Sequence, residues 1–348
     1  MLEEFSLATL NEIVSFLSEP STYGKPDFPV TVRETHMSFV FLHDDRVYKL
    51  KKPVTGPFMN FSTLAAREVN CREEVRLNRR LAPDTYLSVL PVTLQADGSL
   101  CLDGSGKAVE WLVEMRRLPD KLMLDRLLET GAVTPGHMTG LVDRLADFYR
   151  TGARPAIDPR DHLRTLECQK DITRETLRHE GFDVDHRAIA HVLNDLDCAF
   201  YAVQNAIVQR IESGHYVEGH GDLRPEHICF CDPLVIFDCL EFNPRLRFID
   251  PFDEVAFLAM ECAFSGAGDA GETIRGLLQH ALADQIPDSL WFFYVAFRAT
   301  LRARMSYSHL IDGSAKETSV WEQKTDRYVS LAQAALYSGF SVGSKMAR

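Results

Sequence analysis

The sequence predicts an α+β fold in two lobes, a β-rich N-terminal lobe followed by a mostly helical C-terminal lobe. Short apolar runs joined by tight turns, typical of hairpins, dominate as far as residue 116. Beyond Arg116-Arg117-Leu118-Pro119, apolar residues recur at the spacing of amphipathic helices. A chain of 348 residues is long enough to give both lobes a core. We therefore expect one lobe over 1–116, a second over 117–338, and a polar tail over 339–348.

The N-terminal lobe is expected to combine two helices with about five strands. Ser6 is a plausible cap for a helix over 6–17, and a second helical pattern covers 63–81. His43-Asp44-Asp45 separates two β-runs and predicts a hairpin, while Asp97-Gly98 predicts a second one. The expected strands are 38–42, 46–50, 87–94, 100–102 and 108–115.

The C-terminal lobe is expected to be helical on both sides of one irregular stretch, Val217–Phe252. Thr134-Pro135 has the cap and first-turn proline of a helix start. The expected helices are 122–128, 134–149, 161–177, 188–212, 252–262, 271–284, 289–310 and 319–338.

Composition excludes several classes of function. The formal net charge of −12 disfavours nonspecific binding to nucleic acid or to anionic membranes, and slightly favours a cationic substrate. No apolar run approaches the roughly 18 residues of a membrane helix. The start Met1-Leu2-Glu3-Glu4 lacks the features of a signal peptide. Since the eight cysteines form no CxxC pairs, we expect reduced thiols and a cytoplasmic location.

The irregular stretch contains the residues that predict chemistry. Asp222, in His220-Gly221-Asp222, lies where glycine, proline and charged neighbours indicate a loop. Asp238 follows Val235-Ile236-Phe237, which reads as a short buried strand. In phosphoryl transfer, one carboxylate accepts the substrate hydroxyl proton and another holds the metal on the nucleotide phosphates. Either aspartate taken alone is more often a turn or cap residue.

A lysine and a glutamate in the first lobe complete this pattern. Lys49 and Lys51 share one face of the second hairpin strand because side chains alternate along a strand. Lys49 is either a solvated edge residue or a phosphate ligand. Its ion-pair partner is predicted to be Glu74, with Glu73 as the alternative; both glutamates otherwise read as members of solvated helix pairs.

These residues resemble the protein-kinase-like fold, specifically its aminoglycoside phosphotransferase-like branch. The stretch His220-Gly221-Asp222-Leu223-Arg224-Pro225-Glu226-His227-Ile228 is similar to the branch's pattern HGDxxxxN, and Ile236-Phe237-Asp238 resembles its metal-binding segment. Arg46–Pro53, Leu77–Pro83 and Phe237–Arg245 resemble a group of uncharacterised bacterial proteins. In that group the kinase-like domain is often followed by a P-loop ATPase domain. The resemblance therefore suggests, as an alternative to a fused domain, a separate partner protein that contains the P-loop ATPase domain.

The resemblance implies a role for each residue. Asp222 would be the catalytic aspartate, within a loop that includes His220 and Arg224, and Asp238 would bind Mg²⁺. Lys49 would contact the α- and β-phosphates of ATP. The further nucleotide-binding residues that we predict are Glu74, Lys51, Glu114 and Met115, the last two, with Arg116, in the linker that meets adenine. Arg224 has two equal interpretations, binding an anionic substrate or neutralising the carboxylates. Asp250, Asp253 and Glu254 are expected to stabilise the first turn of a helix and to brace the catalytic loop.

Two positions depart from the branch. His227 stands where a metal-binding asparagine is expected, and Mg²⁺ prefers oxygen ligands. His227 is therefore predicted either as a ligand to Mg²⁺ or the softer Mn²⁺, or as a contact to phosphate or substrate. The turn over Thr35-His36-Met37-Ser38 contains no glycine to cover the phosphates.

The function predicted from the sequence is transfer of the γ-phosphate of ATP to a hydroxyl of a small molecule. A nucleotide-binding pseudokinase or regulatory module is the first alternative, because of His227 and the missing glycine loop. A protein AMP-transferase is the second. The fold does not select the acceptor.

Overall fold

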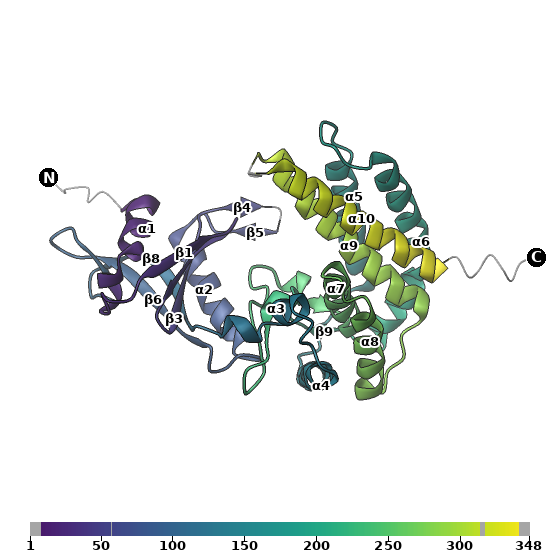
Figure 1. The fold of residues 1–348 in the computed structure, drawn as a ribbon, viewed down its shortest axis with the longest axis horizontal. Helices are drawn as coiled ribbons and strands as arrows, with labels where there is room; N and C mark the ends of the chain where they lie inside the picture. The colour runs from purple at the N-terminus through teal and green to yellow at the C-terminus, as the bar shows by residue number, and fades with distance from the viewer. Residues whose placement is uncertain (1–7, 57, 314–316, 341–348) are drawn as a thin grey trace, which may run out of the picture. The chain divides into compact units, whose positions relative to one another are not determined.

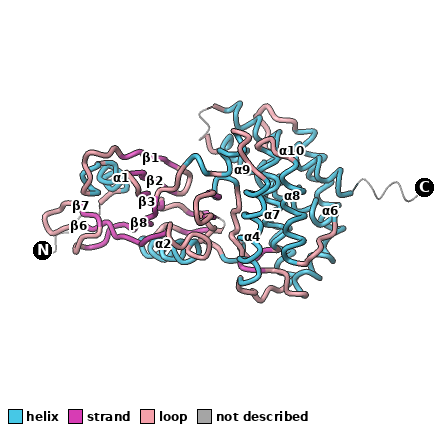
Figure 2. Tube along the Cα trace, turned by 60° about the horizontal axis from the view of Figure 1, so that its bottom comes forward, coloured by secondary structure: helices cyan, strands magenta, loops and turns pink. Residues whose placement is uncertain are grey.

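The computed structural model describes residues 8–56, 58–313 and 317–340, and the chain divides into two compact units. Unit 1 comprises Met1–Leu122 and Ile228–Arg245, and unit 2 comprises Met123–His227 and Leu246–Arg348. The division differs from the expected lobes in two ways: its first boundary follows Leu122 instead of residue 116, and 228–245 groups with the N-terminal unit. The strands lie mainly in unit 1 and the long helices mainly in unit 2 (Figure 2).

Unit 1 is built on a six-stranded antiparallel sheet of order β1-β2-β3-β8-β6-β7, whose strands are labelled in Figure 1 and Figure 2 together. The predicted 43–45 hairpin is confirmed, with Val40 opposite Lys49 in its register. Strand β1 was not predicted, because four of its five residues are exposed and leave no apolar pattern. The strands are β1 (Val30–Glu34), β2 (Ser38–His43), β3 (Arg46–Lys51), β6 (Tyr86–Leu94), β7 (Leu100–Leu102) and β8 (Lys107–Arg116).

The sheet of unit 1 packs against two helices. Helix α1 (Leu10–Ser18) contributes Ile13 and Leu17 to a core with Tyr48 and Leu50. Its cap is Thr9 rather than the predicted Ser6, which lies outside the described residues. Helix α2 (Leu64–Asn78) packs on β8 and β6 and is capped by Thr63. Side chains alternate along β3, so Lys49 and Lys51 point to the face of the sheet opposite the core formed with α1.

Short elements complete unit 1. A two-residue ladder joins β10 (Ile228–Cys229) to β11 (Val235–Ile236) immediately before Asp238. The remaining elements are β4 (Thr55–Gly56), β5 (Met59–Asn60), and the 3-10 helices η1 (Pro20–Tyr23) and η2 (Asp120–Leu122).

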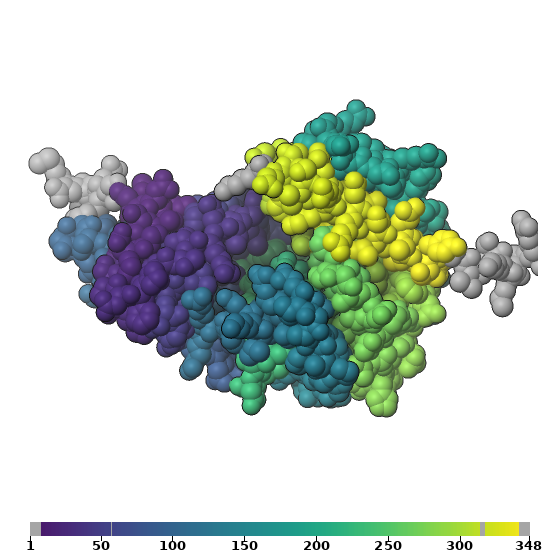
Figure 3. Space-filling model, in the orientation of Figure 1, coloured from purple at the N-terminus to yellow at the C-terminus, as the bar shows by residue number. Residues whose placement is uncertain are grey.

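Unit 2 is helical, as predicted, around the buried helix α7. Every residue of α7 from Pro251 to Cys262 is buried, and the helix packs against α8, α9 and α10. Helix α10 also packs along α9 and α6, and it lies on the surface of the face shown in Figure 3. The helices are α3 (Leu124–Glu129), α4 (Pro135–Thr151), α5 (Pro159–Leu177), α6 (His186–Glu212), α7 (Pro251–Phe264), α8 (Asp269–Leu282), α9 (Asp288–Ile311) and α10 (Thr318–Phe340).

The irregular part of unit 2 is short. Strands β9 (Val217–Glu218) and β12 (Phe248–Ile249) pair with each other, and the 3-10 helix η3 (Pro225–His227) follows β9. A further 3-10 helix, η4 (Pro244–Leu246), begins in the last residues of unit 1 and ends at the first residue of the second segment of unit 2. Helix α10 runs to Phe340, into the predicted tail, and 341–348 lie outside the described residues. No helix in the described ranges is long and apolar enough to cross a membrane.

Candidate active site

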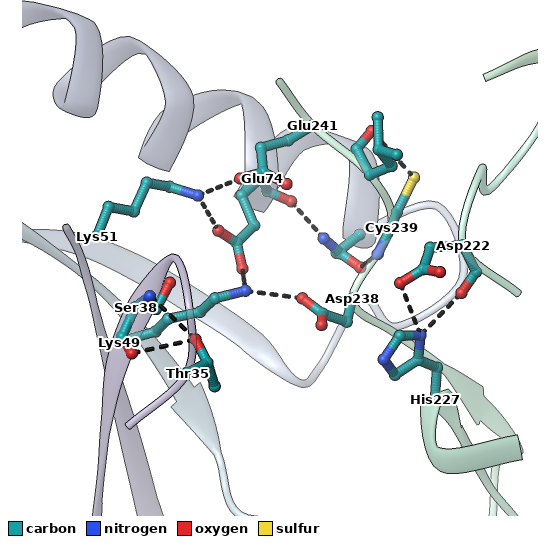
Figure 4. A network of polar contacts seen from close by, with 12 residues as sticks. Thr35, Ser38, Lys49, Lys51, Glu74, Asp222, His227, Asp238, Cys239 and Glu241 are labelled. Carbon is teal, nitrogen blue, oxygen red and sulfur yellow. Dashed lines mark hydrogen bonds and ion pairs between the residues drawn. The ribbon is translucent and has the colours of Figure 1, made fainter. Parts of the chain in front are cut away.

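Unit 1 places two lysines on one buried glutamate. Lys49 Nζ lies 2.9 Å from Glu74 Oε1, and Lys51 Nζ lies 2.6 Å from Glu74 Oε2 (Figure 4). Strand β3 supplies both lysines, two residues apart on the face toward α2, and α2 supplies the glutamate. Glu73 instead pairs at 2.7 Å with Arg76, whose side chain is exposed. The residue paired with Lys49 is therefore Glu74, the first choice of the sequence analysis.

Asp238 is attached to the same network. Its Oδ1 lies 2.7 Å from Lys49 Nζ (Figure 4). Its backbone N–H donates to Tyr86 Oη at 3.1 Å. Asp238 has a positive φ of 62°, so the chain turns sharply after β11. The next N–H, that of Cys239, donates to Asn78 Oδ1 at 2.9 Å. These bonds to β6 and α2 explain why 228–245 groups with unit 1.

A residue that the sequence analysis missed, Glu241, completes the network. Its carboxylate forms a salt bridge with Lys51, which is only 1% exposed and also binds Glu74. Lys51 thus connects α2 to the segment after Asp238, an arrangement that favours positioning over direct contact with nucleotide. The quoted resemblance over Phe237–Arg245 contains Glu241, but nothing in the local pattern indicates a partner 190 residues away.

The charges of this network stabilise the ionised forms of Lys49 and Glu74. Burial opposes ionisation of Lys49, but Asp238 and Glu74 outweigh it and raise the pKa of Lys49. Burial likewise opposes ionisation of Glu74, and the two ammonium groups outweigh it, so the pKa of Glu74 is lowered. Burial raises the pKa of Glu241 in spite of Lys51. A cation held beside two carboxylates is suited to bind phosphate oxygens and to orient a metal ligand.

Unit 2 holds the predicted catalytic loop by its backbone. The carboxylate of Glu254, at the start of α7, accepts hydrogen bonds from the N–H groups of His220 at 2.7 Å and Gly221 at 2.6 Å. Tyr149 Oη in α4 donates to the same carboxylate at 2.8 Å. Gly221 has a φ of 85°, in the region that favours glycine. The expected bracing of the loop by the first turn of α7 is thus provided by Glu254.

The other acids of that turn bind arginines. Asp250 forms a salt bridge with Arg210, and Asp253 accepts two hydrogen bonds of 2.7 Å from Arg298. All these acids are buried. Through these ion pairs Asp250 and Asp253 join the start of α7 to helices α6 and α9.

Arg224 links the residues of the catalytic loop. Its Nη2 lies 2.9 Å from Asp222 Oδ2 and 3.1 Å from His227 Nε2, and its Nη1 binds Glu226. The side chain of Asp222 remains 31% exposed. The backbone N–H of Asp222 donates to His220 Nδ1 at 3.3 Å. His220 is fully buried, so it holds the loop through this bond without being exposed to a ligand.

The imidazole of His227 uses both nitrogens within the loop. Nδ1 lies 2.8 Å from the carbonyl oxygen of Asp222, which only accepts, so Nδ1 carries the proton (Figure 4). Nε2 then presents its lone pair to Arg224 Nη2. Metal ligation through Nε2 would require loss of that hydrogen bond. His227 therefore fits a metal poorly in this arrangement, whereas the Asp238 carboxylate offers the oxygen ligands that Mg²⁺ prefers.

The predicted adenine segment lies at the end of β8, between β3 and β6. Glu114 Oε2 accepts from Ser88 at 2.7 Å, and Met115 is 8% exposed. The N–H of Arg116 already donates to Thr85 O at 2.8 Å. Adenine contacts through Glu114 or Met115 stay a prediction.

The turn between β1 and β2 is closed by hydrogen bonds instead of glycines. The N–H of Thr35 donates to Ser38 O at 2.8 Å, and the N–H of Ser38 donates to Thr35 Oγ1 at 3.0 Å (Figure 4). The hydroxyl of Thr35 thus fixes the conformation of a turn that contains no glycine.

Comparison with solved structures identifies the architecture. A choline kinase from Cryptosporidium parvum superposes with a TM-score of 0.56 and 8% identity, over 92% of this chain and 91% of that one. A thermostable mutant of an aminoglycoside phosphotransferase, in complex with AMP-PNP and hygromycin B, gives 0.53 and 14% identity, over 94% and 98%. A choline/ethanolamine kinase family protein from Mesorhizobium loti gives 0.51 and 15%, over 88% and 92%. These likenesses confirm the predicted fold class.

Sequence comparison finds relatives whose own function is uncharacterised. Proteins of Mycobacterium tuberculosis and Mycobacterium bovis are each 33% identical over 299 residues. The match covers 83% of this chain but only 58% of the length of these curated relatives. No protein-family model matches the chain.

Proposed function

Because this chain has the protein-kinase-like fold of the choline/ethanolamine kinases and aminoglycoside phosphotransferases, we propose that it is an ATP-dependent phosphotransferase. It transfers the γ-phosphate to a hydroxyl of a small molecule. Unit 1 supplies the groups that bind nucleotide, and unit 2 supplies the proton acceptor.

The observation that carries this proposal is the position of the Lys49 ammonium between two carboxylates, Glu74 at 2.9 Å and Asp238 at 2.7 Å. In this proposal Lys49 exchanges part of its contact with Asp238 for oxygens of the α- and β-phosphates. Glu74 keeps the ammonium in place, and Lys51 with Glu241 keeps Glu74 and the Asp238 segment together.

Asp222 is the proposed proton acceptor. The acceptor oxygen forms the new bond to the γ-phosphorus as the bond from that phosphorus to the β,γ-bridging oxygen breaks, and ADP leaves. The hydroxyl proton passes to Asp222. Arg224 orients the Asp222 carboxylate, and Glu254 fixes the backbone that carries it.

Asp238 is the proposed metal ligand. Mg²⁺, or Mn²⁺, would neutralise charge on the β- and γ-phosphates when bound. The carboxylate fits this role by its chemistry, since it is an oxygen ligand 37% exposed.

The test is ADP release from ATP with Mg²⁺ or Mn²⁺ across a panel of hydroxylated acceptors, with mass analysis of the products. A phosphoryl addition that depends on Asp222 supports the proposal. An adenylyl addition would instead identify an AMP-transferase.

A pseudokinase is the second candidate, because His227 directs its unprotonated nitrogen to Arg224 rather than leaving it for a metal. That candidate predicts stabilisation by ATP with no transfer to any acceptor. Thermal unfolding with and without ATP, measured beside the turnover assay, separates the two candidates.

A further inference from the structure

A cavity of about 480 Å³ lies within unit 2 beside the catalytic loop. Arg224 lines this cavity and also donates to Asp222 at 2.9 Å, so one side chain joins the cavity to the proposed proton acceptor. The other walls come from α3, α7, α9 and α10. Its volume is in the range that holds a small organic molecule.

The aromatic rings that line the cavity already have partners. The ring of Trp321 packs at a tilt of 32° against that of His309, with centroids 4.0 Å apart, and Lys324 Nζ lies 4.6 Å from the Trp321 centroid. Tyr328 stacks on Phe264 at 4.1 Å, and the Arg302 guanidinium lies 5.5 Å from its centroid. A quaternary ammonium ligand needs ring faces for its cation–π contacts. Here the protein's own rings and cations occupy those faces.

The acids of the cavity are also largely neutralised. Glu261 lies 2.6 Å from Arg302 Nε and accepts from Tyr328 Oη at 3.0 Å. Glu226 binds Arg224. Asp125 is the remaining acid, and burial raises the pKa of its carboxyl group. The cavity therefore lacks the uncompensated negative charge that would favour a cationic substrate.

Three groups on the cavity wall have unmet bonding capacity. Lys324 has no carboxylate partner in the described part of the chain, its ammonium making only the contact with Trp321. Arg224 Nε is a buried donor without an acceptor, and Asp125 Oδ1 is a buried acceptor without a donor. Two of the three belong to cations, the Lys324 ammonium and the Arg224 guanidinium, so they suit a ligand that accepts hydrogen bonds and carries negative charge. The third suits a hydroxyl donor.

We propose that this cavity binds the acceptor, and that the acceptor is an anionic hydroxy compound whose carboxylate or phosphate group is held by Lys324. Arg224 Nε and Asp125 Oδ1 are enclosed by the protein, so a bond from the ligand to either atom requires that side chain to turn toward the cavity. This inference rests on the proposed phosphotransferase function, and it is opposite to the cationic substrate that the net charge of −12 suggests.

Calorimetric titration of the full chain without ATP tests the proposal. The probes are glycerol, glycerate and glycerol 3-phosphate, which share a three-carbon skeleton, together with choline. We expect at least one of the two anions to bind about tenfold more tightly than glycerol and choline, the effect of one new ion pair. Preference for glycerate assigns a carboxylate, and preference for glycerol 3-phosphate assigns a phosphate ester.

Lys324→Gln should remove that preference and bring the anion to the affinity of glycerol, while Lys324→Arg should retain it. The matched control is Lys170→Gln, because Lys170 also lies over an aromatic ring, at 4.3 Å from the Phe200 centroid, but outside the cavity. This control should bind the anion as the unmodified chain does.

Choline as the tightest probe, two anions no tighter than glycerol, or an unchanged anion affinity in Lys324→Gln would each overturn the proposal. ADP release from Mg-ATP is then measured with the same four probes. Anion binding through Lys324 with no ADP release counts against the phosphotransferase function alone. Turnover of choline in preference to the anions supports that function and overturns the acceptor assignment.

Discussion

Glu74 in unit 1 and Glu254 in unit 2 are both buried, 0% and 1% exposed, but their partners differ in kind. Glu74 binds two ammonium groups, those of Lys49 and Lys51. Glu254 accepts from neutral donors, two backbone N–H groups and a tyrosine hydroxyl. The first arrangement positions charged side chains, and the second holds a main-chain loop in one conformation.

The electrostatics follow the same division. Burial raises the pKa of both carboxyl groups, but two lysines reverse the effect at Glu74 and neutral donors do not reverse it at Glu254. In the proposed function, the charged network can therefore reorganise on binding phosphates, because its ion pairs can be exchanged. A backbone brace has no comparable alternative, and we expect it to keep its geometry.

The largest effect on turnover is expected at Asp222, which lies in the loop that Glu254 holds in place. Asp222→Asn should lower phosphoryl transfer by about 10²- to 10⁴-fold, because the amide cannot accept the hydroxyl proton. Turnover is measured by ADP release, and the variant's urea midpoint should stay close to that of the unmodified chain, since Asp222 is 31% exposed. Full activity in this variant would show that Asp222 is not the base. Unit 2 would then have no assigned proton acceptor.

Removing the charge of Glu74 should give the largest loss of stability. Glu74→Gln leaves two lysines, Lys51 fully enclosed, without their shared carboxylate, and a broken buried ion pair costs about 3–5 kcal/mol. Urea unfolding measures this loss. The control on the same helix is Glu68→Gln, which breaks the 2.8 Å pair with exposed Arg72 and should cost less than about 1 kcal/mol. Equal costs for the two variants would contradict a network held by charge.

Adding a methyl group beside Glu254 should have an intermediate effect on stability and turnover. In Gly219→Ala, the added Cβ would lie 2.7 Å from Glu254 Oε1 and 2.7 Å from Ile249 Cγ2, so the loop or the carboxylate must move. We expect a loss of about 1–3 kcal/mol together with a fall in turnover. Gly140→Ala is the control: nothing lies within 4 Å of its added Cβ, and alanine on this exposed helix position should stabilise by about 1 kcal/mol. A Gly219→Ala variant with unchanged turnover would show that the brace does not set the loop.

The smallest expected effect is a difference between Glu254 and Glu74 in how their contributions to the unfolding free energy change with pH. The pKa of Glu254 is raised above its ordinary value of 4.5, so its protonated form favours folding, and this contribution is lost as pH rises above 4.5. The pKa of Glu74 is lowered below 4.5, so its contribution is present above 4.5 and is lost as pH falls through the folded-state pKa.

Unfolding free energies at several pH values should therefore show opposite trends. The cost of Glu254→Gln, about 1–2 kcal/mol for a weakened buried hydrogen-bond set, should shrink from pH 4 towards neutrality. The cost of Glu74→Gln should grow over the same interval. Parallel trends would mean that the difference between charged and neutral partners does not govern these two sites.

Much of this molecule follows from local sequence patterns. The hairpin at His43–Arg46, the caps at Thr63 and Thr134, and the helices of unit 2 depend on period, turn chemistry and capping within a few residues. Placing Lys49 and Lys51 on one face needed only the two-residue repeat of a strand. The order of these elements predicted the two-lobed α+β architecture, and the resemblance carried by the motif over 220–228 added the protein-kinase-like fold.

Tertiary structure decided what depends on distant partners. Lys49 meets Asp238 189 residues away, and Lys51 meets Glu241 190 residues away. The engagement of both His227 nitrogens, the neutral brace at Glu254 and the pairing of the acids around the cavity were equally invisible in the sequence, because burial and long-range hydrogen bonds leave no local periodic signal. The sequence by itself determined which residues could do chemistry; only the folded chain decided which of them are paired and which are available to a ligand.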